Sequence, residues 1–121
     1  MVLVDSSVWI DHLHKSNVHL AVLLERSEVS VHPMVIGELA LGSIPNRAKV
    51  IELLTDLPSP GVALHSEVMV LIESRGLHGR GLSFIDAHLL ASVAISPDTT
   101  LWTCDKALRS AAETLNKAHT V

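Results

Sequence analysis

The chain has 121 residues, 13 acidic and 9 basic side chains, and a formal net charge of −4; this length suits a single domain, residues 1–121, with a sizeable core. The modest charge argues against both a nucleic-acid-coating protein and a disordered acidic tail. The lone Cys104 excludes an internal disulfide and the apolar stretches are too short to span a membrane, so we expect a soluble cytoplasmic protein.

Strand-like and helical patterns alternate along the chain. In chain order we expect a strand over residues 1–4, a helix starting near 8, a helix over 18–25, a strand over 29–31, helices over 33–42, 47–56, 66–75 and 84–95, a strand over 100–103 and a helix over 106–115. Ser6 or Ser7 is expected to cap the first helix. The glycine-rich segment RGLHGRGLS at 75–83 predicts a flexible basic loop.

This order of elements indicates an α/β fold. Strands separated by helices need crossover connections, which favour a mostly parallel sheet covered by helices on both faces. In such sheets the ligand site lies beyond the carboxyl ends of the strands.

Four acidic residues occur where that site is expected. Asp5 and Asp105 each follow an apolar run at the end of a predicted strand. Glu38 lies in the helix after the second strand, and Asp86 lies in the first turn of the helix over 84–95. All four carboxylates could therefore converge in one crevice.

Each of these acids also has a structural explanation. Asp86 could favour the positive end of its helix, Asp105 could cap the last helix, and Glu38 could face solvent. The apolar neighbours of Glu38 and Asp86 weaken that explanation, because an unpaired carboxylate in a packing segment is costly.

Several carboxylates in one pocket repel one another and are best explained by a bound hard cation. An oxygen-only ligand set favours Mg²⁺ or Mn²⁺, and such an ion can bind a phosphate and activate a water for phosphodiester hydrolysis. Ser7 and Thr103 could orient a carboxylate or a metal-bound water, although ordinary capping explains them about as well. Most of the eight histidines are expected at the surface, and His88 has little claim as a catalytic base.

Four segments resemble the PIN-domain ribonucleases, and specifically the VapC-type toxins of bacterial toxin–antitoxin pairs. They are VDSSVWIDHL, VIGELALG, LSFIDAHLLASVA and LWTCDKAL, in the order and approximate spacing of that family. The resemblance implies a three-layer α/β/α sandwich with a short, mostly parallel sheet. It also implies a Mg²⁺- or Mn²⁺-dependent endoribonuclease.

The resemblance carries over to individual residues. Asp5, Glu38 and Asp86 match the three core metal-binding acids, Asp105 matches a more variable fourth, and Ser7 and Thr103 match supporting hydroxyls. The Cys-Asp-Lys-Ala-Leu stretch after Thr103 departs from relatives that carry a basic residue before the acid, which affects the expected rim for substrate. The family also implies a homodimer and a small antitoxin partner that blocks the active site.

Basic residues must help RNA approach this acidic chain. Arg80 in the glycine-rich loop is the best candidate phosphate contact, ahead of Arg75, Lys106 and Arg109. Each of the four could instead be a solvated surface charge, and for Lys106 and Arg109 that explanation is at least as strong. The RNA target itself is left open.

Other functional classes fit the sequence less well. A receiver domain would have an acidic pair after its first strand, and a haloacid-dehalogenase-like phosphatase would have a DxDxT motif there, whereas Asp5 is followed by Ser6 and Ser7. A catalytically silent PIN-like binding or scaffold protein also remains possible, although intact acids at all four positions argue against it.

Overall fold

A three-stranded parallel sheet lies at the centre of the molecule. The computed structural model describes residues 1–121 throughout, and the strands are β1 (Val2–Val4), β2 (Val29–Ser30) and β3 (Thr100–Trp102), in the order β2-β1-β3. Val2 pairs with Val29 on one side and with Thr100 on the other, so the first strand of the chain is the central one. The three carboxyl ends therefore lie along one edge of the sheet.

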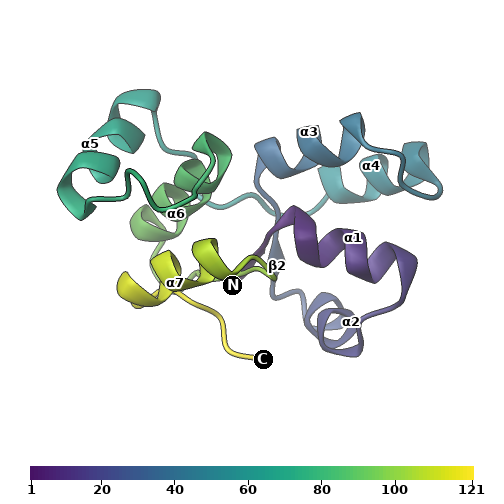
Figure 1. The fold of residues 1–121 in the computed structure, drawn as a ribbon. Coiled ribbons are helices and arrows are strands. Elements are labelled where there is room, and N and C mark those ends of the chain that lie inside the picture. The colour runs from purple at the N-terminus through teal and green to yellow at the C-terminus, as the bar shows by residue number, and fades with distance from the viewer.

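Seven helices cover this sheet. They are α1 (Ser6–His14), α2 (Val18–Glu25), α3 (Pro33–Leu41), α4 (Arg47–Thr55), α5 (His65–Arg75), α6 (Phe84–Ile95) and α7 (Lys106–Thr114). Figure 1 shows α1 to α4 on one side of the sheet and α5 to α7 on the other. The predicted three-layer α/β/α fold with a short parallel sheet is thus confirmed. None of these helices has the length and apolar character needed to cross a bilayer.

Aliphatic side chains hold the layers together. The main cluster contains 21 buried residues, including Leu3 of β1, Leu89 and Leu90 of α6, and Leu101 of β3, each at most 1% exposed. Full burial of one such side chain stabilises the fold by roughly 1.5–3 kcal/mol. The sheet is short, but buried side chains cover both of its faces and hold the three strands in place.

The loop before α6 uses glycine for its backbone shape. Gly76, Gly79 and Gly81 have φ values of 59°, 71° and 74°, in the left-handed region that residues with a Cβ rarely adopt. This explains why the segment RGLHGRGLS is glycine-rich, and it places Arg80 between two such turns.

The predicted cap of the first helix is wrong. Ser6 and Ser7 lie inside α1, whose N-cap residue is Asp5, and the Asp5 side chain makes no capping hydrogen bond. Its carboxylate contacts hydroxyl groups instead, as described below. The other predicted elements are present, with ends that differ by one or two residues; β2, for example, ends at Ser30 rather than residue 31.

Two of the eight histidines are buried, although most were expected at the surface. His32 is 1% exposed and His88 is 6% exposed, and their rings lie edge to face with centroids 6.2 Å apart. His32 caps α3 by accepting a hydrogen bond from the Met34 backbone N–H at 3.0 Å. Its role is therefore to fix the start of the helix that carries Glu38.

Candidate active site

Asp5 occupies the end of the central strand. Its backbone N–H donates to the carbonyl oxygen of Trp102 at 2.9 Å, which continues the pairing of β1 and β3 by one residue. The side chain is only 6% exposed. The parallel sheet thus places this carboxylate at the edge where ligands are expected to bind.

Two hydroxyl groups orient the Asp5 carboxylate. Its Oδ2 accepts hydrogen bonds from Ser7 Oγ at 2.8 Å and from Thr103 Oγ1 at 2.7 Å. Its Oδ1 has only a long contact of 3.4 Å with Ser6 Oγ. One oxygen is therefore held in place while the other keeps acceptor capacity for a ligand.

The backbone after β3 fixes the direction of both hydroxyl groups. Ser7 Oγ accepts from the Cys104 N–H at 3.0 Å, and Thr103 Oγ1 accepts from the Asp105 N–H at 3.0 Å. Each hydroxyl is therefore free to donate its proton to Asp5. The Ser7 and Thr103 predicted from the sequence are joined to Asp5 in one network.

Glu38 lies on α3 with an exposed side chain. Partial desolvation and the negative charge of Asp5 raise the pKa of the Glu38 carboxyl, the Ser6 hydroxyl opposes that shift, and Asp86 adds to it. The sequence indicated an acid embedded in packing; in the structure Val35 and Leu39 are buried, whereas Leu41 and the Glu38 side chain are exposed.

Asp86 stands in the first turn of α6 and is half-buried. It completes a capping box with Ser83: the Ser83 N–H donates to Asp86 Oδ2 and the Asp86 N–H donates to Ser83 Oγ, both at 3.0 Å. Burial raises the pKa of the Asp86 carboxyl, the Ser83 N–H lowers it, and the charges of Asp5 and Asp105 raise it further. The structure therefore supports a role for Asp86 at the start of its helix, and its role as a metal ligand stays a prediction.

Asp105 is exposed and caps α7 by accepting from the Leu108 N–H at 3.1 Å. That structural explanation is correct, yet the charge of Asp105 also reaches Asp86. We call Asp5, Glu38, Asp86 and Asp105 the acidic cluster. The charge of Asp5 raises the pKa of both Glu38 and Asp86, and Asp105 acts on Asp86, so these carboxylates lie close enough to interact in pairs.

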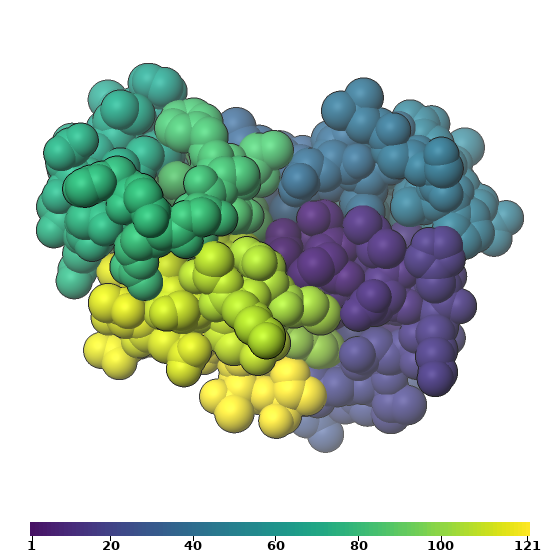
Figure 2. Space-filling model, viewed as in Figure 1, coloured from purple at the N-terminus to yellow at the C-terminus, as the bar shows by residue number.

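The elements that carry the acidic cluster border a hollow in the surface. Figure 1 shows α3 and α6 flanking the start of α1, and Figure 2 shows the surface hollowed between the α5–α6 side and the α3–α4 side. No three His, Cys, Asp or Glu side chains are close enough together to enclose a metal ion on their own. Any ion here would need water molecules among its ligands.

No basic side chain neutralises this cluster. The one Lys or Arg side chain within 4.0 Å of a carboxylate is Lys49, which lies 3.8 Å from Glu52 on the exposed face of α4. Arg109, considered above as a phosphate contact, instead donates from Nη2 to the carbonyl oxygen of Thr103 at 3.0 Å. Arg80 is half-buried and Lys106 is exposed, and neither forms an ion pair with the cluster.

The comparisons with known proteins agree with this fold. The family model described as "PIN domain" matches residues 2–114. The chain belongs to the PIN-domain family. It is 50% identical over 111 residues to "Ribonuclease VapC32" of Mycobacterium tuberculosis, in strains CDC 1551 / Oshkosh and ATCC 25618 / H37Rv, which covers 92% of this chain and 90% of the relative. The resemblance to VapC-type PIN proteins is therefore confirmed.

A solved structure shares the architecture. The crystal structure of PAE2754 from Pyrobaculum aerophilum superposes with a TM-score of 0.58 and covers 94% of this chain and 85% of the other, at 22% sequence identity. At that identity the likeness concerns the fold alone. It agrees with the α/β/α arrangement in Figure 1.

Proposed function

We propose that this chain is a divalent-metal-dependent endoribonuclease and the toxin of a toxin–antitoxin pair. The observation that carries the proposal is the acidic cluster, in which Asp5 is buried and oriented while no basic group offsets the four carboxylates. The relatives that share 50% sequence identity with this chain are named as ribonucleases, which supports the same activity. A cluster of this kind needs a cation to relieve its repulsion.

The oxygen donors of the cluster fit Mg²⁺ or Mn²⁺. In the proposal Asp5, Glu38, Asp86 and Asp105 would bind the ion, some of them through its water ligands, with Asp5 central because it interacts with both Glu38 and Asp86. Mg²⁺ keeps several waters and needs only one or two carboxylates from the protein, so a loose cluster suits it. When bound, the ion supplies an activated water and neutralises charge on the phosphodiester.

The chain's own residues prepare the site for that ion. Ser7 and Thr103 hold the Asp5 carboxylate in one orientation through Oδ2 and leave Oδ1 to face the ligand. The raised pKa values of Glu38 and Asp86 mean that cation binding also favours release of protons from these two carboxyls. A bound cation would therefore lower the pKa of both carboxyls relative to the metal-free protein.

RNA reaches the cluster against a net charge of −4. The proposed phosphate contacts are Arg80, in the loop before α6, and Lys106, at the start of α7. Arg80 lies shortly before Asp86 in the sequence, and Lys106 directly follows Asp105. Phosphate contacts supply most of the sequence-independent affinity for nucleic acid. The remaining attraction comes from the bound cation.

The partner in this proposal is a small antitoxin protein. Glu38 and Asp105 are exposed and have no basic neighbour, so the cluster could accept an arginine side chain in bidentate geometry, which would exclude both cation and RNA. The proposal includes a homodimer, to be tested by light scattering on the purified protein, and a cytoplasmic location, where RNA and antitoxin are available.

The decisive experiment compares Asp5→Asn with Asp11→Asn. Asp11 is an exposed acid of α1, so this control removes the same charge from the same helix region. We expect Asp5→Asn to lower the rate of RNA cleavage by at least about 100-fold with an unchanged circular dichroism spectrum. Substituting a residue that only orients a metal ligand already lowers activity by up to about 100-fold. EDTA should abolish cleavage and Mg²⁺ or Mn²⁺ should restore it. Equal rates for the two variants would refute the assignment.

Expression in cells separates a toxin from a silent scaffold. The intact chain should arrest growth, Asp5→Asn should not, and a small protein encoded beside it should reverse the arrest. Harmless expression together with an inactive purified protein would favour the catalytically silent alternative.

A further inference from the structure

Two histidines from distant parts of the chain meet beside Trp102, the last residue of β3. His19 lies on α2 and His119 lies in the segment after α7, and their Nε2 atoms share a hydrogen bond at 2.9 Å, whose proton a bound metal would replace. Their rings are nearly parallel, with centroids 5.2 Å apart and an interplanar angle of 30°. Both side chains are half-buried, so the two nitrogens share one small, partly enclosed space.

The backbone holds His119 in place. The Leu101 N–H donates to the Lys117 carbonyl at 2.7 Å, and the His119 N–H donates to the Leu101 carbonyl at 2.8 Å. Ala118 thereby forms an isolated parallel bridge with Leu101. The segment behaves as a short addition to β3, which fixes one of the two imidazoles relative to the sheet.

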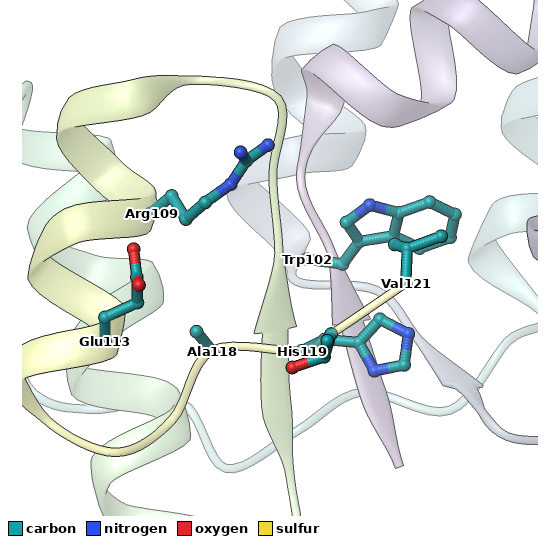
Figure 3. A pocket seen from close by; sticks show the side chains of 7 residues that line it. Trp102, Arg109, Glu113, Ala118, His119 and Val121 are labelled. Carbon is teal, nitrogen blue, oxygen red and sulfur yellow. The ribbon is translucent and has the colours of Figure 1, made fainter.

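A tryptophan and a cavity adjoin the pair. The Trp102 ring centroid lies 5.1 Å from that of His19 and 5.6 Å from that of His119. Figure 3 shows His119 and Trp102 on one side of the neighbouring cavity, which has a volume of about 320 Å³, with Arg109 and Glu113 of α7 on the opposite side. Small solutes can therefore approach His119 from this side.

The separation of the two nitrogens fits adjacent ligands of one metal ion. With metal–nitrogen bonds of about 2.0–2.1 Å, nitrogens 2.9 Å apart subtend about 90° at the metal. A tetrahedral ion would need a separation of about 3.3 Å at the same bond length. The observed spacing thus suits the square-planar or octahedral geometry of Cu²⁺ or Ni²⁺.

The environment of His119 favours the neutral imidazole. Burial and the neighbouring His19 lower the pKa of His119, the carboxylate of Glu28 opposes that shift, and the N-terminal ammonium adds to it. The neutral imidazole is the form that binds a metal. No third side chain completes a ligand set, so water must occupy the other positions.

We propose that His19 and His119 form a binding site for one divalent transition-metal ion of the Cu²⁺ or Ni²⁺ type, separate from the acidic cluster. The ion would clamp α2 to the segment after α7. None of the residues that form this site belongs to the acidic cluster, so the proposal does not depend on ribonuclease activity.

The test is a titration of untagged protein with Cu²⁺ or Ni²⁺, followed by tryptophan fluorescence and calorimetry. Excess Mg²⁺ is present throughout, because it competes at carboxylates and not at imidazoles. We expect quenching that saturates at one equivalent, since Trp102 contacts both rings. His19→Gln and His119→Gln should each weaken binding at least tenfold, and the double variant should be no worse than either.

His12→Gln is the critical control. His12 lies 6.3 Å from Trp9, centroid to centroid, and is the other histidine whose bound metal could quench a tryptophan. The exposed His14→Gln serves as a neutral control. Should a Gln variant fail to fold, NMR of the intact protein gives the same answer, since substoichiometric Cu²⁺ should broaden the imidazole signals of His19 and His119 first. Loss of quenching in His12→Gln alone, equal affinity in all variants, or no saturable binding would overturn the proposal.

Discussion

Thr103 shows how much one hydroxyl can decide at the candidate site. It donates to Asp5 Oδ2 at 2.7 Å and accepts from the Asp105 N–H at 3.0 Å, so it links the central acid to the cap of α7. Thr103→Val keeps the shape and removes both bonds. We expect cleavage to fall about 10- to 100-fold and to need more Mg²⁺ for half-maximal rate, as for other groups that orient a metal ligand.

The matched control for that change is Thr114→Val. Thr114 is an exposed residue whose hydroxyl donates to the Ser110 carbonyl at 3.0 Å within α7. Rates of RNA cleavage measured over a range of Mg²⁺ concentrations distinguish the two variants. A Thr103→Val protein with the parent's rate and Mg²⁺ dependence would show that Ser7 alone orients Asp5.

At the scale of elements, His32 makes the start of α3 sensitive to acid. Burial, with a smaller contribution from His88, lowers the pKa of His32 from 6.5 to about 4. The unfolded chain therefore binds this proton first as the pH falls, so stability should decline between about pH 6.5 and 4, by about 3 kcal/mol from this group. Urea unfolding at several pH values measures the decline.

His32→Asn tests the cause. Asparagine can accept the same hydrogen bond from Met34 and caps helices well, but it does not titrate. We expect a flatter dependence of stability on pH in that variant, and no change of slope in the exposed control His78→Asn. An unchanged slope in His32→Asn would assign the acid sensitivity to other groups.

Element boundaries and burial differ in how far the sequence reveals them. The strands and helices follow from periodicity, so each predicted element is present. The cap of α1 could not be read in this way, because Asp5 has the residue type of a cap but its carboxylate binds Ser7 and Thr103 instead. The apolar residues on either side of His32 and His88 in the sequence indicate that both are buried. The general expectation that most histidines lie at the surface did not take these neighbours into account.

At the scale of the whole molecule, topology was predictable and distances were not. Parallel strands joined by crossovers place Asp5 and the residues after β3 at one edge, and the structure shows that arrangement. The relation of Glu38 and Asp86 to that edge depends on how α3 and α6 pack on the sheet. That packing leaves Glu38 exposed and Asp86 half-buried, a difference that no local pattern encodes.

The overall charge sets how this molecule meets RNA. With a net charge of −4, binding must rely on a few local cations, so each should be visible in the salt dependence. We expect Arg80→Gln to weaken RNA binding and to reduce the slope of log affinity against log salt by about 0.7–1. Binding is measured in the Asp5→Asn background, so that the RNA stays intact.

Arg26→Gln removes the same charge from an exposed position at the end of α2, and should leave the slope unchanged. The comparison separates a local phosphate contact from a general effect of net charge, because both variants change that charge equally. If the two variants lose affinity and slope to the same degree, RNA responds to the charge of the whole molecule, and Arg80 has no contact of its own. If only Arg80→Gln lowers the slope, the RNA path runs over the glycine-rich loop and into the hollow between α3 and α6.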